Sequence, residues 1–377
     1  MSTLKVNAIR GTGASSDAIS VNSTDGTCTA KITNNLSNRN LIINGAMNVA
    51  QRNTDPTTDQ GYCCIDRFGL SNNNIDEATT NSQHALTSSD TGPWAAGFRN
   101  SFHIQNGNQT SGAGADDRVT LYYKTEAQDL ANSGWDYTSA SSYITLSFWV
   151  KSSVAQNFYF FFKTDDSTDY NYVMETGSLS ANTWTKVTKT IPGNSNITIN
   201  NDNGEGALLE FTLFRGTNKT GTRALNTWEV YESSVRVPDM TSTWYTTNDA
   251  TWEITGVQLE VGDVATDFEH RSYGYELERC KRYYFQFGGS TDETDRFLIE
   301  GYTKNTSYSV VSHISYTMRA APAVTKVGTW QDNNGATLSF NYRDANQCAV
   351  RLIAGSNDTA SYAHTDADSY LTFSSEL

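Results

Sequence analysis

The sequence has few basic residues for its length and no long apolar run. Its 377 residues include 27 lysines and arginines against 41 aspartates and glutamates, which gives a formal net charge of −14 at pH 7. Such a chain offers no basic field to phosphate groups, so we expect no nucleic-acid partner. A membrane-spanning helix needs about 18 or more apolar residues in a row. No such stretch occurs, so we expect no membrane insertion.

Cysteine and histidine are also scarce, with five of each. An odd number of cysteines, two of them adjacent at Cys63 and Cys64, favours free thiols in a chain that folds in a reducing cytoplasm. The first ten residues carry no apolar segment of the kind found in a secretory signal, so export by that route is not expected.

The motifs that mark common catalytic and metal sites are missing. No two histidines stand at metal-ligand spacing within one expected element, and no Cys-x-x-Cys pair occurs. Neither a Gly-Lys-Ser/Thr phosphate loop nor a Gly-x-Ser-x-Gly turn is present. We therefore predict no catalytic residue, no enzymatic activity and no cofactor other than the calcium ion considered below.

Small polar and aromatic residues are abundant. Serine, threonine and asparagine number 121, and the 8 Trp, 20 Tyr and 16 Phe supply ample material for a core. Side chains of the first group compete with helical backbone bonds and suit strands and turns. So many aromatic residues exclude a disordered chain. This composition predicts an all-β fold rich in loops.

Strand signals recur from about residue 41 onward. Residues 143–151 show the clearest alternation of apolar and other side chains, which is typical of a half-buried strand. Gly256 interrupts a similar strand and predicts a β-bulge. Many short strands separated by polar turns favour a jelly-roll β-sandwich. The predicted parts are an extended N-terminal arm (1–40), a jelly-roll sandwich (41–270), a short connecting helix (271–284) and a small C-terminal β-sandwich domain (285–377).

The N-terminal arm has apolar alternation but no aromatic residue. Ile19 and Val21 alternate with polar neighbours, and so do Cys28, Ala30 and Ile32. One chain cannot bury so thin an apolar set, whereas several copies around an axis can. We expect the arm to attach the protein to a larger assembly and to join copies of the chain into a homotrimer.

A single helix is predicted between the two β-rich regions. Tyr273, Leu277, Cys280 and Tyr284 are spaced to form one apolar stripe. Ser272 stands where an N-cap residue is expected. A lone helix in this position is typical of a connector between domains.

One acidic loop is a candidate cation site. Asp165, Asp166 and Asp169 follow an expected strand, and carboxylates in such a loop can hold Ca²⁺. The loop has neither the glycine nor the distal glutamate of an EF-hand. An ordinary solvated acidic turn is the alternative.

Several aromatic residues are candidates for binding sugars, because Trp and Tyr rings stack on the apolar faces of sugar rings. Trp149 and Tyr143 lie opposite the apolar stripe of their strand, and the others stand among turn residues. The predicted carbohydrate-binding residues are Trp94, Trp135, Tyr137, Tyr143, Trp149, Trp244 and Tyr245.

Three motifs carry a family resemblance. The first is NLIINGAMNVAQR at residues 40–52, followed by Tyr62 and by DRF at residues 66–68. The second is GVQLEVGDVATDFE at residues 256–269, and the third is RSYGYELERCKRYY at residues 271–284. Together they resemble tail fibre proteins of tailed bacteriophages, particularly those of marine and cyanobacterial phages.

This resemblance implies a jelly-roll domain like those of carbohydrate-binding modules, followed by a terminal β-domain. It further implies a structural protein of the virion tail, joined to other tail proteins by its N-terminus and made in the host cytoplasm. The expected function is adhesion to host surface polysaccharide or lipopolysaccharide. No ligand-binding residue carries over, because the motifs mark scaffold positions.

Two other functions stay open at this point. A tail-associated polysaccharide depolymerase would need two carboxylates about 5–10 Å apart, and Glu205 with Glu210 or Asp165 with Glu175 are the pairs that the sequence offers. A cellular lectin-like adhesin is the other alternative. The missing secretory signal and the unpaired cysteines speak against it.

Overall fold

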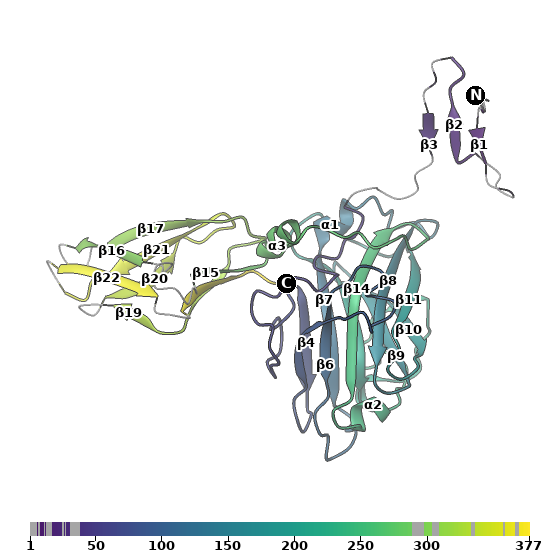
Figure 1. Ribbon diagram of the computed structural model, residues 1–377, viewed down its shortest axis with the longest axis horizontal. Coiled ribbons are helices and arrows are strands. Elements are labelled where there is room, and N and C mark those ends of the chain that lie inside the picture. The colour runs from purple at the N-terminus through teal and green to yellow at the C-terminus, as the bar shows by residue number, and fades with distance from the viewer. Residues whose placement is uncertain are drawn as a thin grey trace.

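The computed structural model shows an all-β chain, as predicted. Its parts are a small N-terminal sheet, a two-sheet sandwich and a C-terminal β-domain, with a short helix between the last two (Figure 1). No helix in the described part of the chain is long and apolar enough to cross a membrane. The described residues are 6, 8–10, 12, 17–24, 26, 28–30, 38–288, 298–303, 309–332, 336–356, 359–365 and 369–377.

The N-terminal sheet is small, and its first two strands are poorly buried. Strands β1 (Ala8–Ile9), β2 (Ile19–Val21) and β3 (Cys28–Ala30) pair antiparallel and stand apart from the sandwich (Figure 1). The side chain of Ile9 is 54% exposed, which agrees with the expectation that this arm lacks a core of its own. Ile32, which the arm prediction includes, lies outside the described residues.

Two antiparallel sheets form the sandwich. The six-stranded sheet has the order β13-β10-β9-β12-β7-β4, and the five-stranded sheet has the order β11-β8-β14-β6-β5. The first comprises β13 (Trp228–Val230), β10 (Tyr170–Ser178), β9 (Asn157–Thr164), β12 (Glu205–Arg215), β7 (Arg118–Glu126) and β4 (Phe68–Asn73). The second comprises β11 (Thr185–Pro192), β8 (Tyr143–Ser152), β14 (Thr251–Val261), β6 (Asn100–Gln105) and β5 (Thr80–Ala85). Short helical turns are α1 (Ala127–Ala131), η1 (Thr217–Lys219) and α2 (Thr243–Thr246).

Aromatic rings fill the space between the sheets. The rings of Phe148 and Phe160 meet edge to face with centroids 5.1 Å apart, and Phe211 lies 5.1 Å from Phe148. These edge-to-face contacts are favourable beyond the area that they bury. Along β8 the inward positions are those predicted from alternation, and their side chains are fully buried: Ile144, Leu146, Phe148 and Val150.

The predicted bulge in β14 is confirmed. The register between β14 and β8 shifts between Thr255 and Gln258, and Gly256 adopts a φ of +66°. A side chain is strained in that conformation. There is also no room for one, because a Cβ at Gly256 would stand 2.6 Å from the ring of Phe98.

Four of the five cysteines are buried free thiols, as expected from their number: Cys63, Cys64, Cys280 and Cys348. The two adjacent cysteines share one acceptor, since both sulfur atoms lie 3.0 Å from Oδ1 of Asn81. The side chain of Cys28 lies outside the described residues.

Helix α3 (Tyr273–Lys281) is shorter than predicted, and its buried face differs in part. Ser272 caps it, as expected, by accepting a hydrogen bond from the backbone of Tyr275. Cys280 is buried, but Tyr273 is 58% exposed, so its place in the apolar stripe was wrong. Tyr284 begins strand β15 instead of ending the helix, because its backbone pairs with Ser374.

The C-terminal domain consists of three three-stranded sheets, ordered β15-β23-β18, β16-β22-β19 and β17-β21-β20. Val350, Leu352, Leu371 and Phe373 are fully buried at its centre. Its strands are β15 (Tyr284–Gly288), β16 (Leu298–Thr303), β17 (Ser309–Ser315), β18 (Ala323–Val327), β19 (Trp330–Asp332), β20 (Thr337–Asn341), β21 (Gln347–Ile353), β22 (Thr359–Thr365) and β23 (Tyr370–Ser374).

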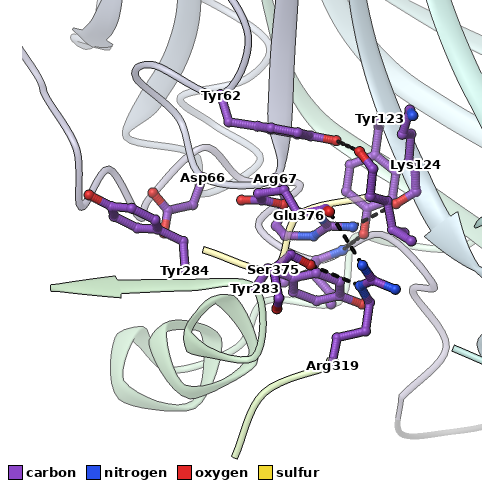
Figure 2. Close-up of polar contacts among 12 residues, drawn as sticks. Tyr62, Asp66, Arg67, Tyr123, Lys124, Tyr283, Tyr284, Arg319, Ser375 and Glu376 are labelled. Carbon is purple, nitrogen blue, oxygen red and sulfur yellow. Dashed lines mark hydrogen bonds and ion pairs between the residues drawn. The ribbon is translucent and has the colours of Figure 1, made fainter. Parts of the chain in front are cut away.

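A buried arginine connects this domain to the sandwich. Arg67, at the start of β4, is completely buried and forms an ion pair with Glu376, beyond β23 (Figure 2). Its other terminal nitrogen donates to the carbonyl of Lys124 at 2.6 Å, and its guanidinium lies 3.4 Å from the ring centroid of Tyr283. We call these contacts and their neighbours below the interdomain joint.

Two further arginines complete the interdomain joint. Arg52 donates to Glu376 at 3.0 Å and stacks 3.5 Å from the ring centroid of Tyr284. Arg319 donates to the carbonyl of Ser375 at 2.9 Å and also bonds the carbonyl of Asn203 in the sandwich. Charged groups from both domains therefore neutralise each other at one place.

The sequence motifs of the resemblance meet at this joint. The backbone amide of Asn44 donates to Glu276 on α3, and Arg271 donates to the carbonyl of Asn40 at 2.7 Å. Ile43, Val49, Cys280 and Tyr283 form one buried apolar cluster. Segments more than 200 positions apart in the sequence thus form a single structural unit.

Replacing Glu376 tests how much the interdomain joint contributes to the stability of the chain. We expect Glu376→Gln to lower the free energy of unfolding by about 3–5 kcal/mol, because it leaves the charge of Arg67 buried without its carboxylate. Urea unfolding followed by tryptophan fluorescence measures this. Seven of the eight tryptophans lie between residues 94 and 252, so the signal reports the sandwich.

The matched control is Glu278→Gln, which removes the exposed pair with Lys281 on α3 and should cost less than about 1 kcal/mol. The double variant Arg67→Met, Glu376→Gln should regain most of the lost stability, since the buried guanidinium of Arg67 is then gone as well. Equal stability of Glu376→Gln and Glu278→Gln would contradict the role given to the ion pair between Arg67 and Glu376.

Candidate functional site

The outer face of the five-stranded sheet carries a row of polar and aromatic side chains. Because side chains alternate along a strand, the positions between the buried residues of β8 point away from the core. Strand register places Lys186 beside Trp149, and Lys151 beside Glu253, which in turn pairs with His103. These side chains cross four neighbouring strands.

A pocket of about 360 Å³ opens on this face at Trp149. It is formed by strands β8, β11 and β14, by the loop between β5 and β6, and by the segment after β14. We call it the Trp149 pocket. Its lining residues are Ala95, Ala96, Phe98, Ser147, Trp149, Lys186, Gly256, Asp267, Phe268 and His270.

Two glycines determine the shape of the pocket. Gly92, with a φ of +100°, lies so close to Trp149 that an added Cβ would stand 2.6 Å from its ring. The backbone at Gly92 therefore packs against one side of the indole ring of Trp149, and Trp149 is half-buried. The bulge at Gly256 admits the ring of Phe98, which packs against Phe268 with centroids 4.8 Å apart.

His270 closes one side of the pocket. Its Nε2 lies 2.8 Å from the carbonyl of Ala96, and its ring centroid lies 5.1 Å from that of Phe98. This contact joins the loop between β5 and β6 to the segment after β14. The pocket thus combines one indole face with an ammonium group, a carboxylate and an imidazole from Lys186, Asp267 and His270.

A charged cluster centred on Glu253 lies beside the Trp149 pocket. Glu253 is buried, and Lys151 Nζ and Ser101 Oγ each lie 2.8 Å from its carboxylate. His84 Nδ1 stands 3.0 Å away, and His103 Nδ1 stands 3.7 Å away. Burial alone would raise the pKa of Glu253, but the two histidines and Lys151 outweigh it and hold that pKa well below its usual value.

Lys151 links this cluster to a second tryptophan. Asp90 accepts hydrogen bonds from Lys151 at 3.2 Å and from the indole nitrogen of Trp184 at 3.0 Å. Lys151 Nζ also lies 4.8 Å from the ring centroid of Trp184, a cation–π contact. Lys151, Asp90 and Trp184 thereby hold one another in place beside the pocket.

Trp149 is the one predicted carbohydrate-binding residue that lines this pocket. Trp94 is half-buried in the adjoining loop, where Arg99 covers its ring at 3.8 Å. Tyr143 is half-buried at the far end of β8, paired with Pro192, and Tyr137 is half-buried and donates to the carbonyl of Ile199. These three lie outside the lining of the pocket.

Three predicted site residues need correction, because they are core residues. Trp135, Trp244 and Tyr245 are at most 3% exposed, so their rings offer no face to a ligand. Their polar atoms are satisfied internally; the hydroxyl of Tyr245, for example, donates to Asp117 at 2.9 Å. Turn residues surround them in the sequence, but their rings extend inward between the two sheets.

The acidic loop also needs correction. The ammonium group of Lys163 lies between Asp165 and Asp169, with ion pairs to both. Asp166 is buried and accepts two hydrogen bonds from Asn200, at 2.8 and 2.9 Å. Burial raises the pKa of Asp165 to about 6 although Lys163 opposes the rise. The Lys163 ammonium group thus lies between two of the three carboxylates and Asn200 engages the third, so the predicted Ca²⁺ site does not fit the loop.

The acid pairs considered for hydrolysis are likewise engaged. Glu205 pairs with Lys124 at 2.6 Å, and Glu210 pairs with Arg215 at 2.5 Å. Glu175 accepts a hydrogen bond from Asn157 at 2.9 Å. Each of these carboxylates thus has a partner within the sandwich.

The sequence reasoning missed Trp184, Lys186, Phe98 and His270. Trp184 and Lys186 stand two positions apart at the start of β11, so the alternation of that strand could have placed both on the face of Trp149. Phe98 and His270 are 172 positions apart in the sequence and gave no such signal.

Comparisons of this chain with known proteins yielded structural likenesses at low sequence identity and low TM-score. No protein-family model matches it, and no curated protein matches its sequence. A protein from Bacteroides thetaiotaomicron described as sugar-binding superposes with a TM-score of 0.34 and 12% identity, over 59% of this chain and 100% of that chain. The enzymatically active domain of tailspike protein 4 from bacteriophage CBA120 gives 0.31 and 12%, over 59% of this chain and 21% of that chain.

A xylan-binding domain of Paenibacillus barcinonensis gives a TM-score of 0.25 at 11% identity, over 57% of this chain and 100% of that chain. Two of these three proteins are thus described as binding saccharides, and the third belongs to a phage tail. At such identities and scores the likeness assigns no ligand to this chain.

The Glu253 cluster predicts a pH-dependent contribution to stability. The hydrogen bond between His84 and Glu253 raises the pKa of His84 above its ordinary value of 6.5. The folded chain therefore holds this proton more tightly than the unfolded chain. The resulting stabilisation is complete below pH 6.5 and is lost as the pH rises through the raised value. In metal-free buffer we expect His84→Ala to be less stable than the parent at pH 5.5, by less than about 1 kcal/mol since the ring is half-exposed.

Thermal unfolding at pH 5.5 and pH 9 measures this difference, which should vanish at pH 9. His313→Ala, at an exposed position of β17, is the control and should show no such dependence. A difference for His84→Ala that is the same at both pH values would show that the charged contact with Glu253 contributes nothing.

Proposed function

We propose that this chain is a carbohydrate-binding protein of a phage tail fibre, and that the Trp149 pocket holds the sugar. The observation that carries the proposal is the half-exposed indole of Trp149, fixed in a pocket of about 360 Å³ beside Lys186, Asp267 and His270. A pocket of that volume falls in the lower part of the range for small-molecule sites.

The chemistry of the pocket suits a saccharide. The flat indole stacks on the apolar face of a pyranose ring, while the ammonium, carboxylate and imidazole groups can bond to hydroxyls around the edge of the ring. The side chain of Lys186 is exposed, so it can also meet a carboxylate or phosphate on an acidic sugar. Near the pocket, the positive charge of Lys186 thus offsets part of the net negative charge of the chain.

Binding without hydrolysis is the activity that we propose. Glu253, the buried acid next to the pocket, is held ionised by Lys151 and by its contacts with His84 and His103. A general acid must keep its proton near neutral pH, and Glu253 does the opposite. The other acids considered for hydrolysis pair with residues of the sandwich, as described above.

The tail-fibre part of the proposal rests on the sequence motifs and on the N-terminal sheet. Motifs at residues 40–52, 256–269 and 271–284 resemble phage tail fibres, and the side chains of β1 and β2 are poorly buried. In this proposal the N-terminal arm binds other tail proteins and joins three copies of the chain in the virion. Three sites per trimer then turn weak sugar contacts into firm attachment to host surface polysaccharide or lipopolysaccharide.

The decisive variant for the pocket is Trp149→Ala. A glycan array of bacterial surface polysaccharides first identifies a ligand of the parent chain, and calorimetry gives its Kd. We expect the variant to bind that ligand at least about tenfold more weakly, a loss of about 1.4 kcal/mol, because the stacking surface is gone. Unchanged circular dichroism verifies that the variant is folded.

Tyr342→Ala is the matched control. Tyr342 is 80% exposed in the C-terminal domain, so its loss removes an aromatic surface far from the Trp149 pocket and should leave Kd unchanged. If Tyr342→Ala weakens binding and Trp149→Ala does not, the C-terminal domain and not the pocket holds the glycan.

Oligomeric state tests the fibre assignment separately. Sedimentation equilibrium of the full chain should give three times its 41.6 kDa mass, because the arm needs partner copies to bury its apolar side chains. A chain that starts at residue 38 should sediment as one copy. A full chain with the mass of a single copy would overturn the trimer while leaving the sugar pocket untouched.

A further inference from the structure

Three residues with metal-binding side chains converge next to the Trp149 pocket. One ligand atom from each of His84, His103 and Glu253 lies within 4.8 Å of the other two. His84 Nδ1 is 3.0 Å from one oxygen of Glu253, and His103 Nδ1 is 3.7 Å from the other. Zinc ligands stand about 2.0–2.2 Å from the ion, so small side-chain movements would bring all three into range.

Sheet register creates this arrangement. Glu253 on β14 faces His103 on β6 directly. His84 on β5 faces Ser101, two positions before His103, and so stands on the diagonal. Diagonal neighbours across strands are close enough for long side chains to touch, and the two imidazole centroids lie 5.3 Å apart. Three adjacent strands thus present the three side chains from a rigid platform.

We propose that His84, His103 and Glu253 bind one divalent transition-metal ion of the zinc class. Two neutral imidazoles and one carboxylate are a donor set that zinc adopts when a further coordination position stays open. Calcium and magnesium prefer sites made of oxygen atoms alone. His84 is exposed, so the open position faces solvent on the same face as the Trp149 pocket.

Neighbouring groups already hold the ligands in place. Ser101 Oγ donates to one carboxylate oxygen of Glu253, and Lys151 Nζ pairs with the other. Such supporting contacts orient metal ligands. His103 Nδ1 is buried and has no hydrogen-bond partner among the described residues. A metal ion would give this nitrogen the partner that it lacks.

The charge of the surroundings also favours a cation. Lys151 is the one fixed positive charge in the cluster, and it faces two carboxylates, Glu253 at 2.8 Å and Asp90 at 3.2 Å. With both histidines neutral, the group carries one net negative charge. A divalent ion would hold β5, at the edge of the sheet, to its neighbour β6 and to the central strand β14.

The test uses the full chain, freed of metal with EDTA and then dialysed. Calorimetric titration with zinc chloride should show one ion bound per chain, whereas calcium chloride and magnesium chloride should give no binding heat. Titration with cobalt chloride should produce the visible absorption bands of four-coordinate Co²⁺. His84→Ala and His103→Ala should each weaken zinc binding at least about tenfold.

His313→Ala is the control and should bind zinc like the parent. Circular dichroism in EDTA verifies that each variant is folded, and His84→Ala is the safer of the two because its side chain is exposed. The proposal is overturned if zinc gives no heat, or if neither His84→Ala nor His103→Ala weakens binding. It is also overturned if His313→Ala weakens binding as much as they do, since zinc would then bind scattered surface histidines.

Discussion

The ion pair between Arg67 and Glu376 is the contact on which the arrangement of the two domains depends. A guanidinium with no exposed surface must have a carboxylate, and the one that it finds lies more than 300 positions away, beyond β23. Exchanging a buried ion pair for apolar residues often costs little net stability, so we assign such a pair mainly to specificity. Here it admits one orientation, in which Tyr283, Arg319 and Ser375 also find their partners.

Much of the fold could be predicted from the sequence, because the relevant signals are local. Alternation placed Ile144 to Val150 on the inner face of β8, and Gly256 marked the bulge. The helix was found, but its buried face was wrong at Tyr273, since the helix packs against residues 43–49, which the periodicity of 273–284 cannot reveal. Two of the quoted motifs now have a structural explanation, because residues 40–52 and 271–284 contact each other at the interdomain joint.

The candidate site could be predicted only in part, because it depends on side chains that tertiary structure brings together. Trp149 was found from its outward position on β8. Trp244 and Tyr245 were misplaced, since turn residues around an aromatic side chain do not tell whether its ring points inward. The His84–His103–Glu253 cluster was missed because its members lie on three different strands, and only the register of β5, β6 and β14 brings them together.

The C-terminal domain is tied to the sandwich at two points along the chain. It leaves the joint along β15, directly after Tyr283, and comes back to it at residues 375 and 376, where the backbone of Ser375 bonds to that of Tyr283. A pulling force on this domain is therefore divided between two adjacent backbone segments. Separating them requires many contacts to break together instead of one after another, and bending about a single flexible linker is prevented. A rigid mount of this kind transmits load from one end of the molecule to the other.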